Sequence, residues 1–263
     1  MLIPQRQLRL KELLRREGIC DVDSLSAELK VSRSTVRRDL EFLEQTGLVE
    51  RTHGGVVWVG ERGGATRPYI FQQRTADNVT AKQQIARAAR NLASPGQTVL
   101  IDGGTTTLHL ARELLGQAMQ IVTNSLPIAD LFVNDEDAEL VVAGGLMYPR
   151  YGVLLGPMTE NALAAIHANV LFFSVAGVHE GALYNQNLLL VQSERRMMAQ
   201  SQLTVLLADS SKFGQQSLTR LCGLEEVDVV VSDAGLSEEF QRQVREANCR
   251  LVVAPAEDEP PRA

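Results

Sequence analysis

Apolar residues in the first 58 positions recur at the three-to-four-residue spacing of helices, in three separate stretches. Asp23 or Ser24 can cap the second helix, and Ser32 or Ser34 the third, because these side chains accept hydrogen bonds from the first free amides of a helix. The spacing predicts that the following residues face inward: Leu10, Leu13, Leu14, Leu25, Leu29, Val36, Leu40 and Leu43.

A glycine follows the first and the third helical stretch, at Gly18 and Gly47, and is expected to end each helix there. Two β-prone runs come next, on either side of Gly54 and Gly55. A two-residue glycine turn between such runs predicts a β-hairpin. Residues 1–58 are therefore expected to form a winged helix-turn-helix.

Residues 59–77 contain glycine, proline and little apolar periodicity, and are expected to form a linker. Residues 78–256 alternate apolar runs with amphipathic stretches, which predicts an α/β domain with a mostly parallel sheet covered on both faces. The expected strands are residues 98–101, 120–123, 140–143, 170–175, 204–208, 227–231 and 251–253, and the expected helices are residues 81–92, 106–115, 189–200 and 238–247. Residues 257–263 are expected to be a frayed tail.

Charge is distributed unevenly along the chain. The formal net charge of −6 taken alone argues against a nucleic-acid-binding protein. Residues 1–56 hold ten basic and nine acidic residues, whereas the remainder holds 16 basic and 23 acidic ones. DNA binding is therefore compatible with this composition only if one face of the first segment is basic.

The first half of the third helix presents basic and hydroxyl side chains away from its predicted buried stripe. A recognition helix places such side chains against base edges in the major groove, where arginine bonds bidentately to guanine. An exposed charged helix that contacts nothing is the competing interpretation, but the compact helix-turn-helix followed by a hairpin favours binding to double-stranded DNA. The predicted DNA contacts are Ser32, Arg33, Ser34, Thr35, Arg37 and Arg38 on the helix and Arg51, Thr52 and His53 on the wing.

A loop of two glycines and three threonines, at residues 102–107, follows the predicted strand that ends at Ile101. Glycines let the backbone approach an anion, and threonine hydroxyls and helix N-terminal amides can donate to it. A strand-to-helix turn with a threonine cap is the competing interpretation, and the three successive threonines favour a phosphate. Polar residues also follow other predicted strands, at residues 123–125, 144–145 and 209–212.

The run at residues 31–57 resembles the helix-turn-helix of the DeoR family of bacterial repressors. The shared pattern is Ser-x-x-Thr-x-Arg-Arg-Asp-Leu, followed by Leu-x-x-x-Gly and a His-Gly-Gly wing. Residues 102–106, 123–125, 144–145, 152–157 and 209–213 resemble the sensor domain of the same family, so the resemblance covers about the whole chain.

The resemblance implies a repressor of a sugar or carbohydrate catabolic operon that is relieved by a phosphorylated sugar. It also implies a C-terminal fold similar to that of ribose-5-phosphate isomerase, and we expect a homodimer or homotetramer that meets repeated half-sites. Two departures stand out: Arg195 replaces a lysine that many members carry, and residues 177–187 lack an acidic-Gly-Leu-Thr pattern. The predicted effector contacts are Asp102, Gly103, Gly104, Thr105, Thr106, Thr107, Asn124, Ser125, Gly145, Arg195 and Lys212.

A sugar-phosphate isomerase with an appended DNA-binding domain is the alternative, and its candidate general bases are Asp102, Glu180, Glu194 and Asp209. Isomerases of this fold carry clustered acidic residues after the middle strand, whereas residues 177–187 hold one, so we expect no enzyme. A regulator whose C-terminal domain only forms oligomers is a third possibility, against which the threonine-rich loop argues.

Neither a metal nor a cofactor is expected. His109 and His167 have no ligand-spaced partners. The sequence has three cysteines, Cys20, Cys222 and Cys249, and no Cys-x-x-Cys motif. An odd number without this motif indicates neither a disulfide framework nor a zinc site. The start of the chain is charged throughout, and no segment approaches the ~20 apolar residues of a membrane span. These features favour the cytoplasm.

Overall fold

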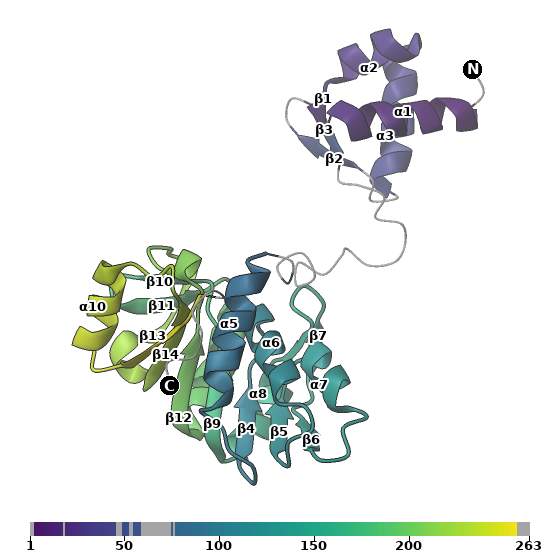
Figure 1. Ribbon diagram of the computed structural model, residues 1–263. Helices are drawn as coiled ribbons and strands as arrows, with labels where there is room; N and C mark the ends of the chain where they lie inside the picture. The colour runs from purple at the N-terminus through teal and green to yellow at the C-terminus, as the bar shows by residue number, and fades with distance from the viewer. Residues whose placement is uncertain are drawn as a thin grey trace. The chain divides into compact units, whose positions relative to one another are not determined.

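The computed structural model describes residues 3–17, 19–45, 49–52, 55–58, 75 and 77–256. The chain divides into an N-terminal unit, Met1–Pro68, and a C-terminal unit, Tyr69–Ala263 (Figure 1). Of the predicted linker at 59–77, residues 75 and 77 are described, and the predicted tail at 257–263 lies outside the described residues.

The N-terminal unit has, in its described part, the three helices and the hairpin that the spacing predicts. A third strand, β1, pairs with β3, so the antiparallel sheet has the order β1-β3-β2. The pattern does not predict β1, because two residues are too few to show alternation. The elements are α1 (Ile3–Glu17), β1 (Ile19–Cys20), α2 (Val22–Leu29), α3 (Arg33–Gln45), β2 (Val49–Thr52) and β3 (Gly55–Trp58).

All eight apolar residues predicted to face inward are buried, and they form one cluster with Val56. Gly55 is the first residue of β3 and pairs with Thr52, so the prediction that Gly55 is a turn residue is wrong. Residues 18, 47, 53 and 54 themselves lie outside the described residues.

Asp21 caps α2, and the prediction of Asp23 or Ser24 at this position is wrong. The Asp21 Oδ1 atom accepts hydrogen bonds from the backbone amides of Asp23 and Ser24, each at 2.9 Å, and its Oδ2 atom accepts from the Ser24 hydroxyl at 2.6 Å. The bonds from Ser24 lower the pKa of Asp21, because they stabilise its charged form. All three residue types suit a helix start, so spacing alone does not choose among them.

The C-terminal unit is built, within its described residues, on a seven-stranded sheet whose neighbouring strands are all parallel (Figure 1). All seven predicted strands take part, and their order is β15-β14-β12-β9-β4-β5-β6. The chain winds to one edge after β4 and to the other after β9, so the topological switch point lies between these two strands. The strands are β4 (Thr98–Ile101), β5 (Gln120–Thr123), β6 (Glu139–Val142), β9 (Ala168–Phe173), β12 (Ser201–Leu207), β14 (Val229–Asp233) and β15 (Arg250–Ala254).

Helices cover both faces of this sheet. Val99 and Ile101 of β4 belong to one buried cluster, shared with α5, α6 and α7, whereas Leu100 belongs to a second cluster, shared with α8, α9 and α10. This alternation is expected of strands buried on both sides. The helices are α5 (Val79–Arg90), α6 (Thr105–Glu113), α7 (Leu126–Phe132), α8 (Pro157–Ala164), α9 (Leu188–Ala199) and α10 (Glu238–Glu246), of which the pattern does not predict the short α7 and α8.

The C-terminal unit also has short antiparallel strands, which are not part of the parallel sheet. A hairpin pairs β7 with β8, and a separate sheet has the order β10-β11-β13. Glu180 and Gly181 turn the chain between β10 and β11 with φ of 47° and 71°. The pattern does not predict these strands, which are β7 (Leu146–Tyr148), β8 (Val153–Leu155), β10 (Gly177–His179), β11 (Ala182–Asn185) and β13 (Thr219–Gly223).

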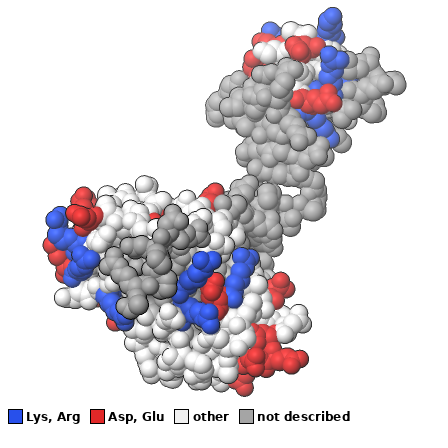
Figure 2. All heavy atoms as spheres, viewed as in Figure 1, with Lys and Arg blue, Asp and Glu red and all other residues white. Residues whose placement is uncertain are grey.

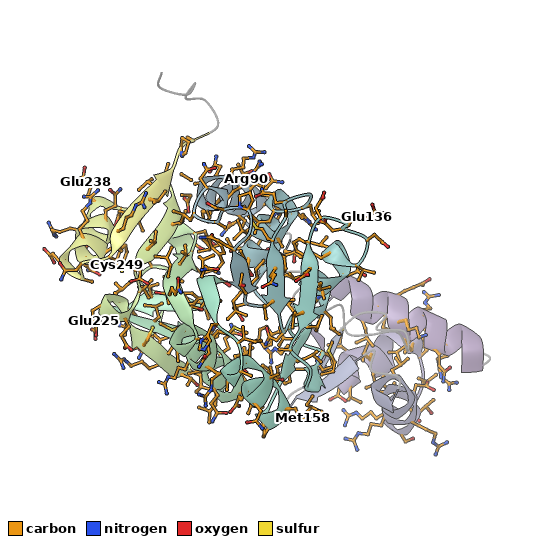
Figure 3. All side chains as sticks on the ribbon, turned by 90° about the horizontal axis from the view of Figure 1, so that it is seen from below. Arg90, Glu136, Met158, Glu225, Glu238 and Cys249 are labelled. Carbon is orange, nitrogen blue, oxygen red and sulfur yellow. The ribbon has the colours of Figure 1, made fainter. Side chains whose placement is uncertain are left out.

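Charged side chains lie at the rim of the C-terminal unit, whereas Cys249 lies further in (Figure 3). Cys222 and Cys249 are both buried, and burial raises the pKa of the Cys222 thiol to about 12 and that of the Cys249 thiol to about 11. Neither thiol is therefore an activated nucleophile at neutral pH. None of the helices in the described part of the chain has the length and apolar character needed to cross a bilayer.

Candidate functional site

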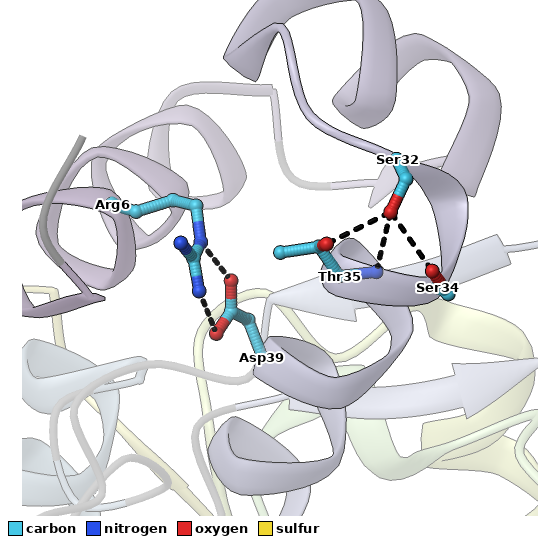
Figure 4. Close-up of polar contacts among 5 residues, drawn as sticks. All are labelled: Arg6, Ser32, Ser34, Thr35 and Asp39. Carbon is cyan, nitrogen blue, oxygen red and sulfur yellow. Dashed lines mark hydrogen bonds and ion pairs between the residues drawn. The ribbon is translucent and has the colours of Figure 1, made fainter.

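Helix α3 carries the predicted DNA contacts on its exposed side. Ser32 stands before its first turn, and its Oγ atom accepts from the Thr35 amide at 3.2 Å and lies 2.8 Å from the hydroxyl oxygens of Ser34 and Thr35 (Figure 4). Ser32 is one of the two caps predicted for this helix. The Ser32 hydroxyl thus bonds to those of Ser34 and Thr35 and shapes the start of α3.

The arginines of α3 are the cations that it presents to solvent. Arg33 forms an exposed ion pair with Asp23 of α2, with 2.5 Å between Nε and Oδ1. Arg37 and Arg38 are exposed one turn further along. On the face shown in Figure 2, basic and acidic side chains of this unit lie next to one another.

The predicted wing contacts are only partly described. Arg51 and Thr52 lie in β2, and His53 lies outside the described residues.

A partly buried ion pair joins α3 to α1. The Arg6 guanidinium donates to both carboxylate oxygens of Asp39, at 2.5 Å from Nε and 3.1 Å from Nη2 (Figure 4). Asp39 is 4% exposed, and the hydrogen bond to it raises the pKa of Arg6. Asp39 is buried whereas Arg37 and Arg38 are exposed, so this pair orients the helix without using the exposed arginines.

Asp39→Ala is expected to destabilise the N-terminal unit by about 2 kcal/mol, because it leaves the Arg6 guanidinium without its partner. Trp58 in β3 is the single tryptophan of the sequence, so its fluorescence during urea unfolding of the full chain reports on this unit. Asp23→Ala removes the exposed ion pair to Arg33 and should leave the midpoint unchanged. Equal midpoints for the wild type and Asp39→Ala would contradict this role.

The glycine- and threonine-rich loop joins the end of β4 to the start of α6, beside the switch point of the sheet. The Thr107 hydroxyl donates to the Asp102 carbonyl at 2.7 Å and accepts from the Gly104 amide at 2.8 Å. Thr107 therefore holds the shape of the loop. Thr105 and Thr106 occupy the first turn of α6, where backbone amides have no intrahelical acceptor.

Both glycines of the loop stand where a side chain does not fit. A Cβ atom on Gly103 would lie 2.1 Å from the Val153 Cγ1 atom, and one on Gly104 would lie 1.9 Å from the Ser174 Oγ atom. The loop thus lies closely against β8 on one side and against the residue that follows β9 on the other.

Gly104→Ala is expected to lower the stability of the C-terminal unit by about 1–3 kcal/mol, because the new methyl group overlaps the Ser174 hydroxyl. Thermal unfolding followed by circular dichroism measures this loss. Gly144→Ala is a matched control, since a Cβ atom there meets no heavy atom within 4 Å. Adding Ser174→Gly to Gly104→Ala should restore the midpoint, and a failure to restore it would disprove the stated cause.

Asn124 and Ser125 lie next to this loop, as their position after β5 predicts. A Cβ atom on Gly103 would come within 3.3 Å of the Ser125 Cβ atom. The Asn124 side chain donates to the Leu154 carbonyl at 3.0 Å, and its Oδ1 atom is buried with no hydrogen-bond partner among the described residues. This oxygen can therefore accept a hydrogen bond from a ligand.

The remaining predicted contacts lie further from the loop or bond elsewhere. Lys212 is half-buried in the short 3-10 helix η1 (Ser210–Lys212) after β12, two strands away from β4. Gly145 lies against the Thr159 hydroxyl of α8. The Arg195 guanidinium donates to the carbonyl oxygens of Leu221 and Arg220, at 2.8 and 3.0 Å.

Glu194 belongs to this site, although the sequence pattern names it only as a candidate base of an enzyme. Its carboxyl group is buried, and the negative charge of Asp102 acts on it. Burial, first, and Asp102, second, raise the pKa of Glu194 well above its ordinary value, against an opposing hydrogen bond from Asn185. No local signal reveals this influence, because Asp102 is far in the sequence from Asn185 and Glu194.

His109 of α6 is buried, and burial lowers its pKa, assisted by the charges of Arg112 and Lys82. The imidazole is therefore neutral at neutral pH. In the part of the chain that the structure describes, no group of three or more His, Cys, Asp or Glu side chains is arranged to hold a metal ion.

Two family models match this chain. A DeoR-like helix-turn-helix domain matches residues 6–62, and a DeoR C-terminal sensor domain matches residues 77–234. The transcriptional regulator GlpR of Haloferax volcanii is 32% identical in sequence, and the similarity covers 96% of this chain and 98% of GlpR. The L-fucose operon activator of Haemophilus influenzae is 31% identical in sequence, and the similarity covers 90% of this chain and 95% of the activator.

Among solved structures, ribose-5-phosphate isomerase A from Methanocaldococcus jannaschii is similar to this chain with a TM-score of 0.37. The sequence identity is 20%, over 50% of this chain and 53% of the isomerase.

Proposed function

The chain belongs to the DeoR family of transcriptional regulators, and from this premise we propose that it represses a sugar catabolic operon until a phosphorylated sugar binds its C-terminal unit. The observation that carries the proposal is the presence, in one chain, of a capped helix with exposed arginines and of a glycine- and threonine-rich loop at a sheet switch point. Residues 1–58 are the DNA-binding domain, 59–77 the linker and 78–256 the effector-binding domain in this proposal.

DNA is contacted by the exposed side of α3 in this proposal. Arg37 and Arg38 approach base edges or phosphates, and Arg33 can exchange its exposed partner Asp23 for a phosphate. Ser32 and Ser34 contribute hydroxyl groups, Thr35 helps to form the cap, and Arg51, Thr52 and His53 of the wing meet the flanking backbone. Homodimers or homotetramers, joined through the C-terminal units, place such helices on repeated half-sites.

The phosphate of the effector lies at the start of α6 in this proposal. Thr105 and Thr106 donate through their hydroxyls and amides, and Gly103 and Gly104 let the backbone come close. Asn124 and Ser125 meet the effector from the neighbouring strand, and Lys212 adds a positive charge at the rim. Thr107 acts by shaping the loop, and we leave out Arg195 because its guanidinium is bonded to β13.

The effector acts by favouring one arrangement of the two units, in which the operator is bound more weakly. The named relative from Haemophilus influenzae is an activator, so the sign of the response is part of the proposal and of its test. A gel shift with the DNA that flanks its own gene, with and without pentose and hexose phosphates, provides that test. Release of the DNA supports the proposal, and tighter binding or no response by any sugar phosphate contradicts it.

In this proposal the chain binds the sugar phosphate without converting it, and it is a regulator and not an isomerase. Both named relatives are regulators of transcription. Incubation of the purified protein with ribose 5-phosphate and fructose 6-phosphate, followed by NMR, measures turnover. Isomerised product at a rate above that of buffer would favour the enzyme.

A further inference from the structure

Strand β6 forms one edge of the seven-stranded sheet (Figure 1). The amide of Ala143, the residue after the strand, donates to the Thr123 carbonyl of β5 at 2.8 Å. Because peptide groups alternate in direction along a strand, the amides and carbonyls of Leu140 and Val142 point away from β5. Among the described residues, β5 is the only strand that pairs with β6. The outer side of β6 is therefore open to a further strand.

The side chains along this edge are apolar and exposed. Val141 is 47% exposed and Val142 is 39% exposed, on opposite faces of the strand. Residues 133–148 contain neither lysine nor proline, the residue types that most often protect a natural edge strand from pairing. At the other edge of the sheet, β15 begins with the exposed Arg250, is followed by Pro255, and packs against α5 and α10. The β6 edge is thus the one that suits the addition of a strand.

A second copy of β6 fits this edge in antiparallel orientation, with a two-fold axis at Val141. Leu140 of each copy then lies opposite Val142 of the other, and the two residues exchange both backbone hydrogen bonds. Val141 faces the same residue of the other copy in a non-hydrogen-bonded pair, where side chains come closest. The Glu139 carboxylate accepts from the Gln120 side chain of β5 at 2.8 Å, and Glu139 stands at the outer end of the ladder, so the two copies of this charge do not meet.

Apolar side chains beside the edge enlarge this surface. The Thr159 hydroxyl donates to the Gly144 carbonyl at 2.9 Å, which places the first turn of α8 at the end of β6. Met158 in this turn and Leu146 at the start of β7 are each 73% exposed, and Figure 3 shows Met158 at the periphery of the C-terminal unit. A ladder of four residues alone buries less area than a stable dimer needs, so these side chains belong to the contact.

We propose that the β6 edge, with Val141, Val142, Leu146 and Met158, is the surface through which two C-terminal units associate. The partner is a second copy of this chain, and the two seven-stranded sheets join into one continuous sheet across a two-fold axis at Val141. This inference rests on the part of the proposed function in which the C-terminal units hold the copies together, and it names the surface that does so.

Sedimentation equilibrium of the full chain, over a range of concentrations, compares the wild type with Val141→Lys and Leu218→Lys. Val141→Lys should raise the dissociation constant of the pair by about 100-fold or more and halve the observed mass, because two ammonium groups meet at the axis. Leu218 is the matched control, since it is an apolar side chain that is 84% exposed outside this surface. Leu218→Lys should keep the mass of the wild type.

Val141→Cys tests the two-fold axis itself, and it decides the question if Val141→Lys does not fold. The Cα atoms of a non-hydrogen-bonded antiparallel pair lie about 4.5 Å apart, within the range that a disulfide spans. Mild oxidation should therefore link most of the Val141→Cys chains in pairs on a non-reducing denaturing gel. The wild type controls for the three natural cysteines, and Leu218→Cys controls for chance collisions. Neither control should form the linked pair.

Three results would overturn this surface: an unchanged mass in a folded Val141→Lys variant, an equal loss of mass in Leu218→Lys, or no more cross-linking in Val141→Cys than in Leu218→Cys. Each leaves the proposed function standing, because the copies would then associate through another surface. A wild type that is monomeric at every concentration would instead overturn the arrangement on repeated half-sites in the proposed function, and the surface with it.

Discussion

Replacing Arg37 and Arg38 together by alanine is expected to weaken operator binding by about 100-fold or more. Both side chains are exposed on α3, beyond the Ser32 cap, whereas the neighbouring Asp39 is buried. An arginine that contacts a guanine or a phosphate contributes about 1–3 kcal/mol, and two such losses combine to this factor. The fold should persist, because neither residue belongs to the core of the N-terminal unit.

Salt dependence separates phosphate contacts from a general loss of fold. The slope of log affinity against log salt concentration should decrease by about 0.9 for each phosphate contact removed. Fluorescence anisotropy with labelled operator DNA at several salt concentrations measures both quantities.

Arg242→Ala with Arg245→Ala is the matched control for this prediction. These two arginines are exposed on α10 of the C-terminal unit, so the control changes the net charge by the same amount. It should bind the operator like the wild type. Wild-type affinity and salt slope in the Arg37→Ala, Arg38→Ala variant would refute α3 as the DNA-reading helix.

Replacing Thr105 and Thr106 by valine is expected to leave operator affinity intact and to reduce effector affinity by about 100-fold. Valine has nearly the shape of threonine, so the first turn of α6 keeps its packing and loses two hydroxyl donors. Hydrogen bonds to a charged group contribute about 1.5–3 kcal/mol each. Titrating a sugar phosphate into the complex of protein and operator, and following the release of DNA, measures the effect.

Thr107→Val gives the contrasting result. The Thr107 hydroxyl bonds to the Asp102 carbonyl and to the Gly104 amide, so its loss should lower thermal stability. Normal release of DNA from the Thr105→Val, Thr106→Val variant would place the phosphate elsewhere.

Local spacing predicted much of this fold because each element is encoded by its own short period. The leucines of α1 and α2, the stripe of α3 and the seven apolar strands all lie where the pattern places them. A period is visible only in an element long enough to repeat it. For that reason β1, β7, β8 and β10, each of two or three residues, escaped prediction.

Function at the level of family was also readable in short motifs, since Ser32 to Leu40 and residues 102–107 each form one continuous segment. The roles of single side chains within those motifs were not. Thr105, Thr106 and Thr107 are alike in sequence, and backbone geometry sets Thr107 apart as the residue that holds the loop. Similarly, the sequence does not show which of Asp21, Asp23 and Ser24 caps α2, because all three residue types suit that position; the observed start of the helix identifies Asp21.

Contacts between distant segments depend on how the layers pack, which no local pattern encodes. The charge of Asp102 acts on Glu194 because α9 packs against the sheet. Asn185, which donates to the Glu194 carboxyl group, lies on β11, a strand that the pattern does not predict. Arg195, one residue further, turns to β13 instead. Neighbours on a helix point in different directions, so burial and partners follow from the fold and not from adjacency.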